Sequence, residues 1–266
     1  SADDIPVSLV YQPSEDRHSV RLACDVTIRE TDSNDWWSIR VDAATGETLS
    51  KVNWNAHAGS SAHAPAGSLT QYRVFPFPAE NPDQTTHQLV TDPHDTTASP
   101  FGWHDTNGAA GAEFTTTQGN NVHAYTDLNA DNNPDAGSSP DGTASLTFVF
   151  PIDLTQPPSA YRPAAVTNLF YWNNFIHDFM YGYGFDEANG NFQVNNYGNG
   201  GLGNDDVRAE AQDGSGTNNA NFFTPADGQR PRMQMYVGTN PTPDVDGDLD
   251  NLVIVHEYAH GISNRL

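Results

Sequence analysis

The sequence predicts an α+β fold, because residues spaced as in strands and residues spaced as in helices occupy separate stretches of the chain. Strand-like stretches come first, and a long helical stretch follows. Further strand-like stretches then precede an apolar helical run at the C-terminal end. No repeat of fixed period is visible, which argues against a solenoid or a propeller. The 266 residues suffice for one large domain or two small ones, and either size can bury a core.

The N-terminal stretch predicts a small β unit. Apolar residues alternate strictly over residues 20–28 and again over residues 37–41, as in strands with one apolar face. A turn at residues 44–46 and a return strand over residues 48–54 then complete a hairpin. The single cysteine, Cys24, falls within this alternation, so we expect a small buried hydrophobic side chain rather than a nucleophile. One cysteine also excludes a disulfide within the chain.

Residues 56–68 predict a linker. They comprise only alanine, glycine, serine and histidine residues and one proline. Small polar segments of this kind are exposed, and proteases cut them readily. We interpret the two histidines of the segment, His57 and His63, as solvated side chains rather than metal ligands. The composition therefore separates residues 1–55 from residues 69–266.

Strands and one long helix are predicted in the larger part of the chain. Repeated prolines between residues 69 and 142 predict short strands joined by long surface loops. Residues 146–154 alternate as a strand. A helix is expected over residues 163–185, because Pro163 suits the first helical turn and apolar residues follow at helical spacing until two glycines end it. Further strands are predicted at residues 207–211, 222–223 and 233–237.

The charge of the chain argues against two classes of partner. The 11 Lys and Arg residues and 34 Asp and Glu residues give a net charge of −23 at pH 7. A nucleic-acid binder needs clustered Lys and Arg, and so does a protein that docks on anionic lipid. No run of 18 or more apolar residues predicts a membrane span. A surface rich in Asp, Asn, Gly, Thr and Ser instead suits an exported protein.

The C-terminal run contains the motif that carries chemistry, His256-Glu257-x-x-His260. Residues four apart on a helix lie on the same face, so both imidazoles can reach one zinc ion. Glu257 then lies beside the metal, where it can act as general base for a metal-bound water. Asp250 fits an N-cap, and the uncharged residues 252–255 suit a buried helix. The alternative is a buried helix whose histidines make ordinary hydrogen bonds.

Four blocks of the chain resemble the fungalysin-type (M36) zinc metalloproteases, which are secreted endopeptidases. Residues 256–266, HEYAHGISNRL, are similar to the active-site helix of that family. Residues 169–178 resemble its first helix, and residues 211–222 and 232–236 resemble two further blocks in the same order. The resemblance covers most of the chain. It implies a thermolysin-like (zincin) fold, with a β-rich N-terminal half, the zinc helix in the middle and a helical C-terminal half.

The resemblance also implies roles for the motif residues. His256 and His260 are the expected zinc ligands, and Glu257 is the expected general base. The third ligand of the family is a glutamate on a helix a few tens of residues further along, beyond Leu266. We therefore expect residues 1–266 to lack peptidase activity on their own, because a catalytic zinc ion normally has three protein ligands.

A division of the chain follows from the same resemblance. Residues 1–55 resemble the C-terminal part of an inhibitory propeptide, and residues 56–68 then contain the expected maturation site. Residues 69–266 correspond to the N-terminal part of the catalytic domain, which is truncated. The expected partners are a protein or peptide substrate and the chain's own propeptide as inhibitor, with neither nucleic acid nor a membrane.

A candidate substrate-binding strand precedes the motif. In thermolysin-like enzymes an edge strand lines the cleft and pairs with the extended substrate, and Asn-Ala followed by an aromatic residue is typical of it. The matching residues are Asn219, Ala220 and Asn221, with one extra residue before Phe222 that leaves the register open. Strand addition provides main-chain hydrogen bonds whatever the substrate sequence. An ordinary edge strand is the alternative.

Two Asp-rich stretches are candidate calcium sites. Asp and Asn alternate between Asp127 and Asp135, and four aspartates lie between Asp244 and Asp250. Oxygen ligands at such spacing can bind calcium, but neither stretch has the terminal glutamate of an EF-hand. A solvated loop, or in the second stretch a loop that caps a helix, is the alternative. The His-Asp pair at residues 177–178 of the long helix is expected to be structural.

Two functions remain open at this point. The first is a secreted zinc metalloendopeptidase, in which zinc polarises the scissile carbonyl and Glu257 takes the proton of the attacking zinc-bound water. The second is a catalytically inactive extracellular β-rich module, stabilised by calcium, with a vestigial zinc motif. A glutamate in a helical segment beyond Leu266 would favour the enzyme.

Overall fold

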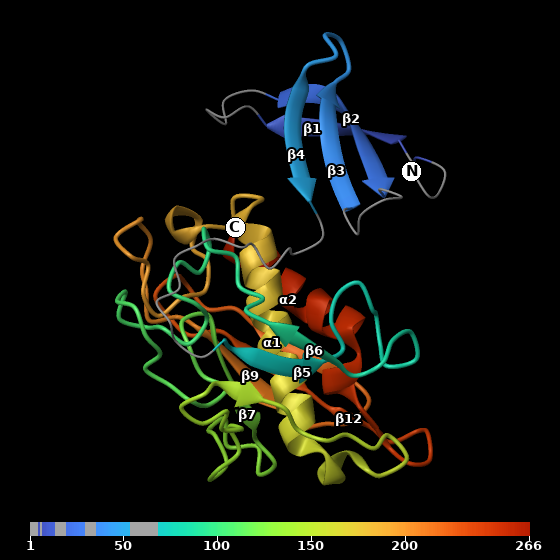
Figure 1. Ribbon diagram of the computed structural model, residues 1–266, viewed down its shortest axis with the longest axis vertical. Coiled ribbons are helices and arrows are strands. Elements are labelled where there is room, and N and C mark those ends of the chain that lie inside the picture. The colour runs from blue at the N-terminus through green and yellow to red at the C-terminus, as the bar shows by residue number, and fades with distance from the viewer. Residues whose placement is uncertain (1–4, 6, 14–19, 30–35, 54–68) are drawn as a thin grey trace. The chain divides into compact units, whose positions relative to one another are not determined.

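A computed structural model describes residues 5, 7–13, 20–29, 36–53 and 69–266 (Figure 1). The chain divides into two compact units, Ser1–Gly59 and Ser60–Leu266. The predicted linker at residues 56–68, with its two histidines, lies outside the described residues. Helices and several separate sheets occur together, which confirms the α+β class. Within the described ranges, no helix is both long enough and apolar enough to cross a membrane.

The N-terminal unit is a four-stranded antiparallel sheet in the order β1-β2-β3-β4. Its strands are β1 (Val7–Pro13), β2 (Val20–Arg29), β3 (Trp36–Asp42) and β4 (Thr48–Asn53). Three of them agree with the predicted strands, and β1 is an additional one. Asp42 closes the β3–β4 turn, because its carboxylate accepts hydrogen bonds from the backbone N–H groups of Ala44 (2.9 Å) and Thr45 (2.8 Å).

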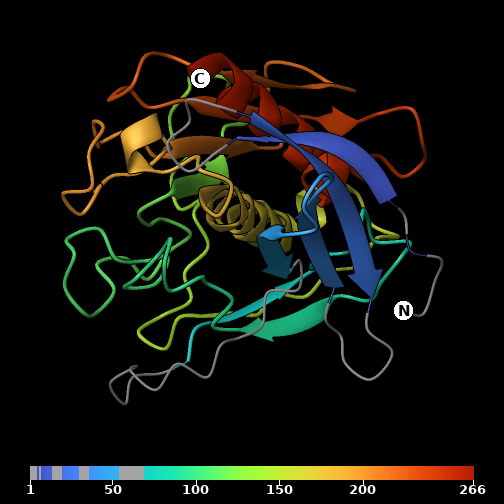
Figure 2. The ribbon, with the colours of Figure 1, turned by 90° about the horizontal axis from the view of Figure 1, so that it is seen from above.

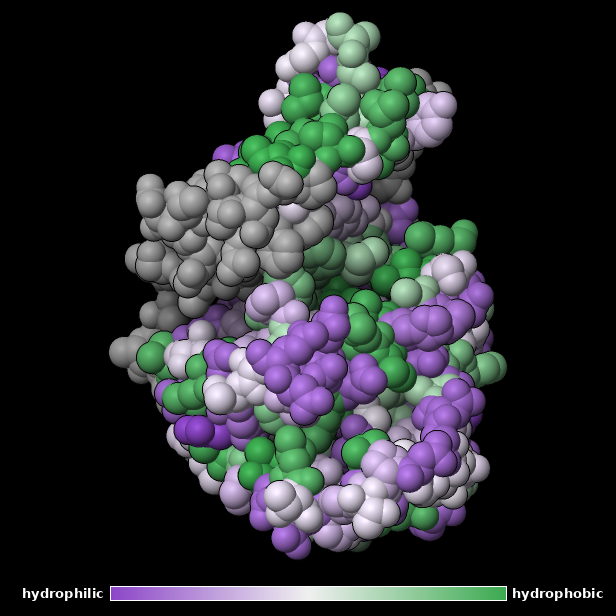
Figure 3. Space-filling model, turned by 90° about the vertical axis from the view of Figure 1, so that its right-hand side faces the viewer, coloured by the Kyte–Doolittle hydropathy of each residue, from purple (hydrophilic) through white to green (hydrophobic). Residues whose placement is uncertain are grey.

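One face of this sheet is apolar. The register places Leu9 opposite Cys24 and Cys24 opposite Val41, so the alternating residues of three strands share one face. Leu9 is 66% exposed and Tyr11 is 73% exposed. Figure 3 shows hydrophobic residues, in green, on the surface of this unit. Cys24 is only half-buried, contrary to the prediction, because this unit provides no second layer of secondary structure in its described part.

Residues 69–266 contain three small sheets and two α-helices. The main sheet has the order β10-β11-β9-β7, with β7 (Val122–Thr126), β9 (Val207–Ala211) and β11 (Arg232–Met235) parallel and β10 (Ala220–Phe223) antiparallel to β11. The second sheet, β6-β5-β8, comprises β5 (Gln71–Val74), β6 (Gln88–Thr91) and β8 (Thr147–Phe148). The third pairs β12 (Val237–Gly238) with β13 (Val245–Asp246). Short 3₁₀ helices lie at Pro158–Ala160, Glu187–Asn189 and Gly247–Leu249.

Helix α1 (Arg162–Tyr181) forms the centre of the larger unit. It is buried on all sides over residues 164–178, and it contacts β5, β7, β9 and α2 (Asn251–Arg265). Figure 2, which looks nearly along α1, shows the helix between β5 and β6 on one side and α2 on the other. Its buried Asn173 and Asn174 donate hydrogen bonds of 2.9 Å to backbone carbonyls four residues earlier. These internal hydrogen bonds let polar side chains occupy the core.

Two elements differ from the prediction. Helix α1 ends at Tyr181 rather than at residue 185, because Gly182 caps it and Gly184 has a φ of 91°, which favours glycine. The predicted strand over residues 146–154 is wrong, because only β8 is a strand there. The φ of Leu146 is 50°, and Pro151 lacks the N–H that further pairing needs.

Candidate metal centre

Helix α2 carries the predicted motif and begins as predicted. The carboxylate of Asp250 accepts a hydrogen bond of 3.3 Å from a backbone N–H of the first turn. The helix has one buried and one exposed face, and Tyr258 is fully buried. His256 and His260 lie on the exposed face. The packing of α2 therefore turns both imidazoles towards the solvent.

The two imidazoles converge on one point beside α2. The Nε2 atoms of His256 and His260 are 2.9 Å apart, and their rings are nearly perpendicular at 86°. Two nitrogens bound tetrahedrally to one zinc ion are about 3.4 Å apart. The pair therefore fits a zinc ion after a small adjustment of either side chain. Among the residues that the structure describes, no further His, Cys, Asp or Glu side chain joins the pair as a third ligand.

Glu257 lies next to His256 in the sequence but is only 6% exposed. Burial raises the pKa of its carboxyl above the ordinary value, and the imidazoles of His256 and His260 lower the pKa by less. A carboxylate that is shielded from bulk water and close to both imidazoles can accept a proton from a water molecule held beside them. The structure thus brings the three motif residues together.

The start of α2 is fixed by Asn251. Its side-chain amide donates hydrogen bonds to the backbone carbonyls of Phe75 (3.1 Å) and Ala79 (2.8 Å). Its side-chain oxygen accepts a hydrogen bond of 3.0 Å from Asn168 of α1. Because the Asn251 side chain is buried and fully used, it ties the first turn of α2 to the chain after β5 and to the central helix.

The aspartates just before α2 serve the backbone and one glutamine. Asp246 accepts the N–H of Asp248 at 3.0 Å and the side-chain amide of Gln212 at 2.6 Å. Asp248 accepts the backbone N–H of Gln212 at 3.2 Å. Burial raises the pKa of both carboxyls, and repulsion from Asp246 raises the pKa of Asp248 further. These contacts agree with the capping interpretation of the stretch from Asp244 to Asp250.

The predicted substrate-binding residues lie on or beside β10, which is an edge strand of the main sheet. Ala220 and Asn221 belong to the strand, and Asn219 precedes it and is exposed. The Asn221 side chain donates to the side-chain oxygen of Gln234 (3.1 Å) and to the hydroxyl of Tyr236 (2.6 Å). In the described part of the chain, no strand pairs with the outer edge of β10.

Strand β10 packs directly against α2. The ring centroid of Phe222 lies 6.0 Å from that of Tyr258 and 5.8 Å from that of Phe192. Gly261 permits this approach, because a Cβ atom there would lie 2.6 Å from the Phe222 ring. Since Gly261 directly follows His260, the edge strand lies beside the turn of α2 that carries the second imidazole. The predicted strand and the predicted motif are therefore neighbours.

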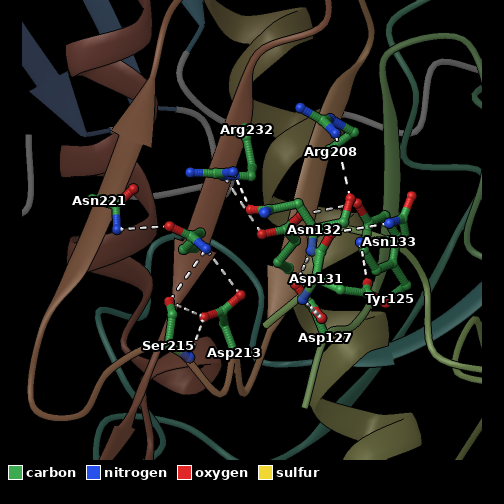
Figure 4. Close-up of polar contacts among 12 residues, drawn as sticks. Tyr125, Asp127, Asp131, Asn132, Asn133, Arg208, Asp213, Ser215, Asn221 and Arg232 are labelled. Carbon is green, nitrogen blue, oxygen red and sulfur yellow. Dashed lines mark hydrogen bonds and ion pairs between the residues drawn. The ribbon is translucent and has the colours of Figure 1, made fainter. Parts of the chain in front are cut away.

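A second group that could hold a metal ion lies at the ends of β7 and β9 (Figure 4). It consists of Asp127, Glu210 and Asp213, which are buried and whose ligand oxygens lie within 4.8 Å of one another. Only Asp127 belongs to a predicted calcium stretch, and the other two residues were missed. No local pattern marks them, because they meet Asp127 only through the parallel pairing of β7 with β9.

Protein donors already surround this acidic cluster. Asp127 accepts two backbone N–H groups of its own loop, at 2.7 and 3.0 Å. Glu210 accepts the hydroxyl of Tyr125 at 3.1 Å, and its other oxygen lies 3.6 Å from Nε of Arg232. Burial raises the pKa of Glu210 to about 7 against the opposing effect of Arg232. The acidic cluster therefore differs from the imidazole pair, which is open to solvent.

His177 and Asp178 have a structural role, as predicted. Nδ1 of His177 lies 2.9 Å from the Asp178 carboxylate, and His177 is fully buried. The same carboxylate accepts hydrogen bonds from the backbone N–H of Asp95, the hydroxyl of Ser99 and the indole N–H of Trp103. These contacts fasten the loop that follows β6 to α1.

Comparison with known families matches residues 71–266 to the fungalysin metallopeptidase family (M36). Extracellular metalloproteinase 2 of Trichophyton tonsurans is 41% identical over 246 residues, which cover 89% of this chain and 36% of that protein. Extracellular metalloproteinase mep of Aspergillus fumigatus is 39% identical over 273 residues, which cover 100% of this chain and 39% of that protein. The chain thus spans less than two-fifths of the length of these relatives. It belongs to the fungalysin (M36) metallopeptidases, a family that implies a zincin-like fold.

Proposed function

We propose that the chain is part of a secreted zinc metalloendopeptidase that cleaves protein or peptide substrates. The observation that carries the proposal is the convergence of His256 and His260, whose Nε2 atoms are 2.9 Å apart on the exposed face of α2. Family membership and the names of the two extracellular relatives support it. Because the chain spans less than two-fifths of those relatives, we assign the activity to a longer protein that contains residues 1–266.

The proposed mechanism assigns one task to each motif residue. When bound, zinc supplies a Lewis acid that polarises the scissile carbonyl and makes water more acidic. His256 and His260 hold the ion through deprotonated ring nitrogens. Glu257 accepts the proton of the attacking water and passes it to the leaving amine. The third protein ligand lies outside residues 1–266 in this proposal.

Strand β10 is the proposed substrate-binding element, with Asn219, Ala220 and Asn221 at its start. Its free outer edge offers backbone N–H and C=O groups to an extended peptide, which suits a protease that accepts many sequences. The hydrogen bonds from Asn221 to Gln234 and Tyr236 keep β10 in register with the rest of the sheet. A thermolysin-like arrangement, with this strand along the cleft, is part of the proposal.

We further propose that residues 1–55 are the end of an inhibitory propeptide, that residues 56–68 contain the maturation site, and that residues 69–266 begin the catalytic domain. The support is that the N-terminal sheet forms a compact unit of its own, Ser1–Gly59. N-terminal sequencing of the secreted enzyme should give a start between residues 55 and 69. A mature start well inside the catalytic unit, near residue 146, would contradict the division.

Calcium at the acidic cluster is a secondary proposal. The carboxylates of Asp127, Glu210 and Asp213 carry more charge than Arg232 balances, and calcium prefers carboxylate oxygens. Added calcium should raise the thermal unfolding temperature of the wild type but not that of Glu210→Gln. Equal responses of the two proteins would reject a calcium site at the acidic cluster.

Zinc analysis of purified variants tests the main proposal. His256→Ala and His260→Ala should each lose the zinc ion that the wild-type longer protein retains, because each substitution removes one of the two imidazole ligands. His94→Ala is a matched control, since His94 lies outside α2. Full zinc retention in both α2 variants would refute the assignment of these histidines as ligands.

A further inference from the structure

The C-terminal end of α2 is held by a buried cation. The side chain of Arg265 is only 4% exposed. Its Nη1 lies 2.8 Å from Oδ2 of Asp205 and 3.3 Å from Oδ1 of Asp227, and it also donates to the carbonyl of Gly190 at 3.1 Å. The guanidinium stacks over the Phe192 ring, 4.7 Å from its centroid. Arg265 therefore joins the last turn of α2 to the loops that precede β9 and β11.

Asp205 is held in place independently of Arg265. It is fully buried, and its carboxylate accepts the backbone N–H of Gln193 (3.1 Å) and of Gly228 (3.1 Å). A buried ion pair adds little stability beyond what apolar packing would add, but it demands a defined geometry. The planar guanidinium makes this demand stricter than a lysine would, because two arms of its rigid fork bind different acceptors: Nη1 pairs with Asp205, and Nη2 donates to the carbonyl of Gln229 at 3.4 Å.

The position of Arg265 matters because the two imidazoles lie within three helical turns before it. His260 is five residues away on the same helix, and His256 is one further turn away. A rotation of α2 by about 10° moves a ring nitrogen about 7 Å from the helix axis by about 1 Å. Metal–ligand distances tolerate only about 0.2 Å. Because both imidazoles turn with α2, this rotation leaves their mutual distance unchanged but decides how the pair faces a third ligand from outside the helix.

We propose that Arg265 is a positioning residue for the metal site. Its ion pair with Asp205 fixes the rotation of the C-terminal half of α2, and thereby the direction in which His260 presents Nε2. Asn251 fixes the start of the same helix through neutral hydrogen bonds, so the two ends are held by different chemistry. The inference rests on the proposed zinc site. It gives Arg265 no contact with substrate or metal.

Three variants and one control isolate this role. Arg265→Lys keeps the charge and removes the fork, and Asp205→Asn keeps the shape of the acceptor and removes its charge. Asp227→Asn is a milder variant for the case in which Arg265→Lys does not fold, since Asp227 is 32% exposed. Arg230→Lys is the matched control, because Arg230 pairs with Asp206 at 2.7 Å and neither residue belongs to α2.

The test uses the natural full-length protein. Arg265→Lys and Asp205→Asn should weaken zinc binding at least tenfold in competition with a chromogenic chelator, and should lower kcat while KM stays unchanged. Arg230→Lys should leave zinc affinity and kcat within twofold of the wild type. This should hold even if Arg230→Lys and Arg265→Lys lower the thermal unfolding temperature equally. Wild-type zinc affinity in Arg265→Lys would overturn the proposal, and so would an equal loss of affinity in Arg230→Lys.

A measurement without metal separates this inference from the proposed function. In the zinc-free protein, the ¹⁵N-labelled imidazoles of His256 and His260 should each give one sharp NMR signal in the wild type. The signals should broaden or double in Arg265→Lys, Asp205→Asn and, more weakly, Asp227→Asn. A wild type that binds no zinc would refute the proposed function, and these spectra would then decide the role of Arg265. Unchanged imidazole spectra in the variants would overturn that role.

Discussion

Two groups of side chains in the described part of the chain could hold a metal ion, and they lie in opposite environments. His256 and His260 are exposed, and each has the other as its ring-nitrogen partner. The carboxylates of Asp127, Glu210 and Asp213 are buried and already accept hydrogen bonds or an ion pair from the protein. A metal ion at the imidazoles replaces only the contact between the two rings, whereas at the acidic cluster it must compete with several buried protein donors. Convergent ring nitrogens that are open to solvent therefore indicate a metal centre better than the number of acidic residues does.

The largest expected effect concerns residues 1–266 taken alone. Two imidazoles fill half of a tetrahedral shell, so the fragment should hydrolyse a fluorogenic peptide at least about 100-fold more slowly than the longer protein, even with added zinc. This outcome would show that the open imidazole pair is not sufficient for hydrolysis. Zinc-dependent turnover by the fragment, lost in its Glu257→Gln variant, would contradict the need for a third ligand.

A smaller effect tests the packing beneath the imidazoles. Replacing glycine by alanine within a helix usually stabilises it by about 1 kcal/mol. At Gly261 the new Cβ would lie 2.6 Å from the Phe222 ring, so we expect Gly261→Ala to destabilise the protein by about 1–3 kcal/mol. Urea unfolding of the zinc-free protein measures this, with Ala259→Gly on the exposed face of α2 as the control for helix propensity. A stabilising Gly261→Ala would contradict the close contact between β10 and α2.

The smallest expected effect concerns the acidic cluster. Burial raises the pKa of Glu210 from 4.5 to about 7, so between these values the folded protein binds more protons than the unfolded chain. The protonated Glu210 carboxyl is therefore favoured in the folded state. The stability that it contributes is fully present below pH 4.5 and is lost as the pH rises through 7. Raising the pH from 5 to 8 should therefore lower the free energy of unfolding of the wild type. In Glu210→Gln, whose side chain cannot ionise, the decrease should be smaller by about 1–2 kcal/mol. Urea unfolding in calcium-free buffers at these pH values provides the comparison, and parallel pH profiles would contradict a buried Glu210 carboxyl.

Local signals account for what could be predicted of the site. The N-cap Asp250, the apolar run after it and the His256/His260 spacing all act within a few residues, and they specified α2 correctly. The uncharged residues 252–255 predicted a buried helix, but α2 exposes one face in residues 69–266, Leu252 and both imidazoles included. The start of α1 was predicted for the same reason, because Pro163 marks its first turn.

Features that depend on pairing between distant strands were missed. Glu210 and Asp213 meet Asp127 only because β7 and β9 pair in parallel, and no residue near either strand specifies that register. The strand predicted over residues 146–154 failed for a related reason. Apolar alternation continues there beyond the two residues of β8, but Pro151 and the positive φ of Leu146 prevent further pairing.

The central claim is that α2 is the catalytic zinc helix, and Glu257→Gln tests it most directly. The amide keeps the size of the side chain but cannot accept the proton of the attacking water. In the longer protein, Glu257→Gln should bind zinc as the wild type does and should lower kcat for peptide hydrolysis at least about 100-fold. Glu113→Gln, an exposed carboxylate outside α2, should change neither quantity. Undiminished hydrolysis by zinc-loaded Glu257→Gln would contradict the mechanism, and a zinc-loaded wild type without any hydrolysis would favour an inactive extracellular module.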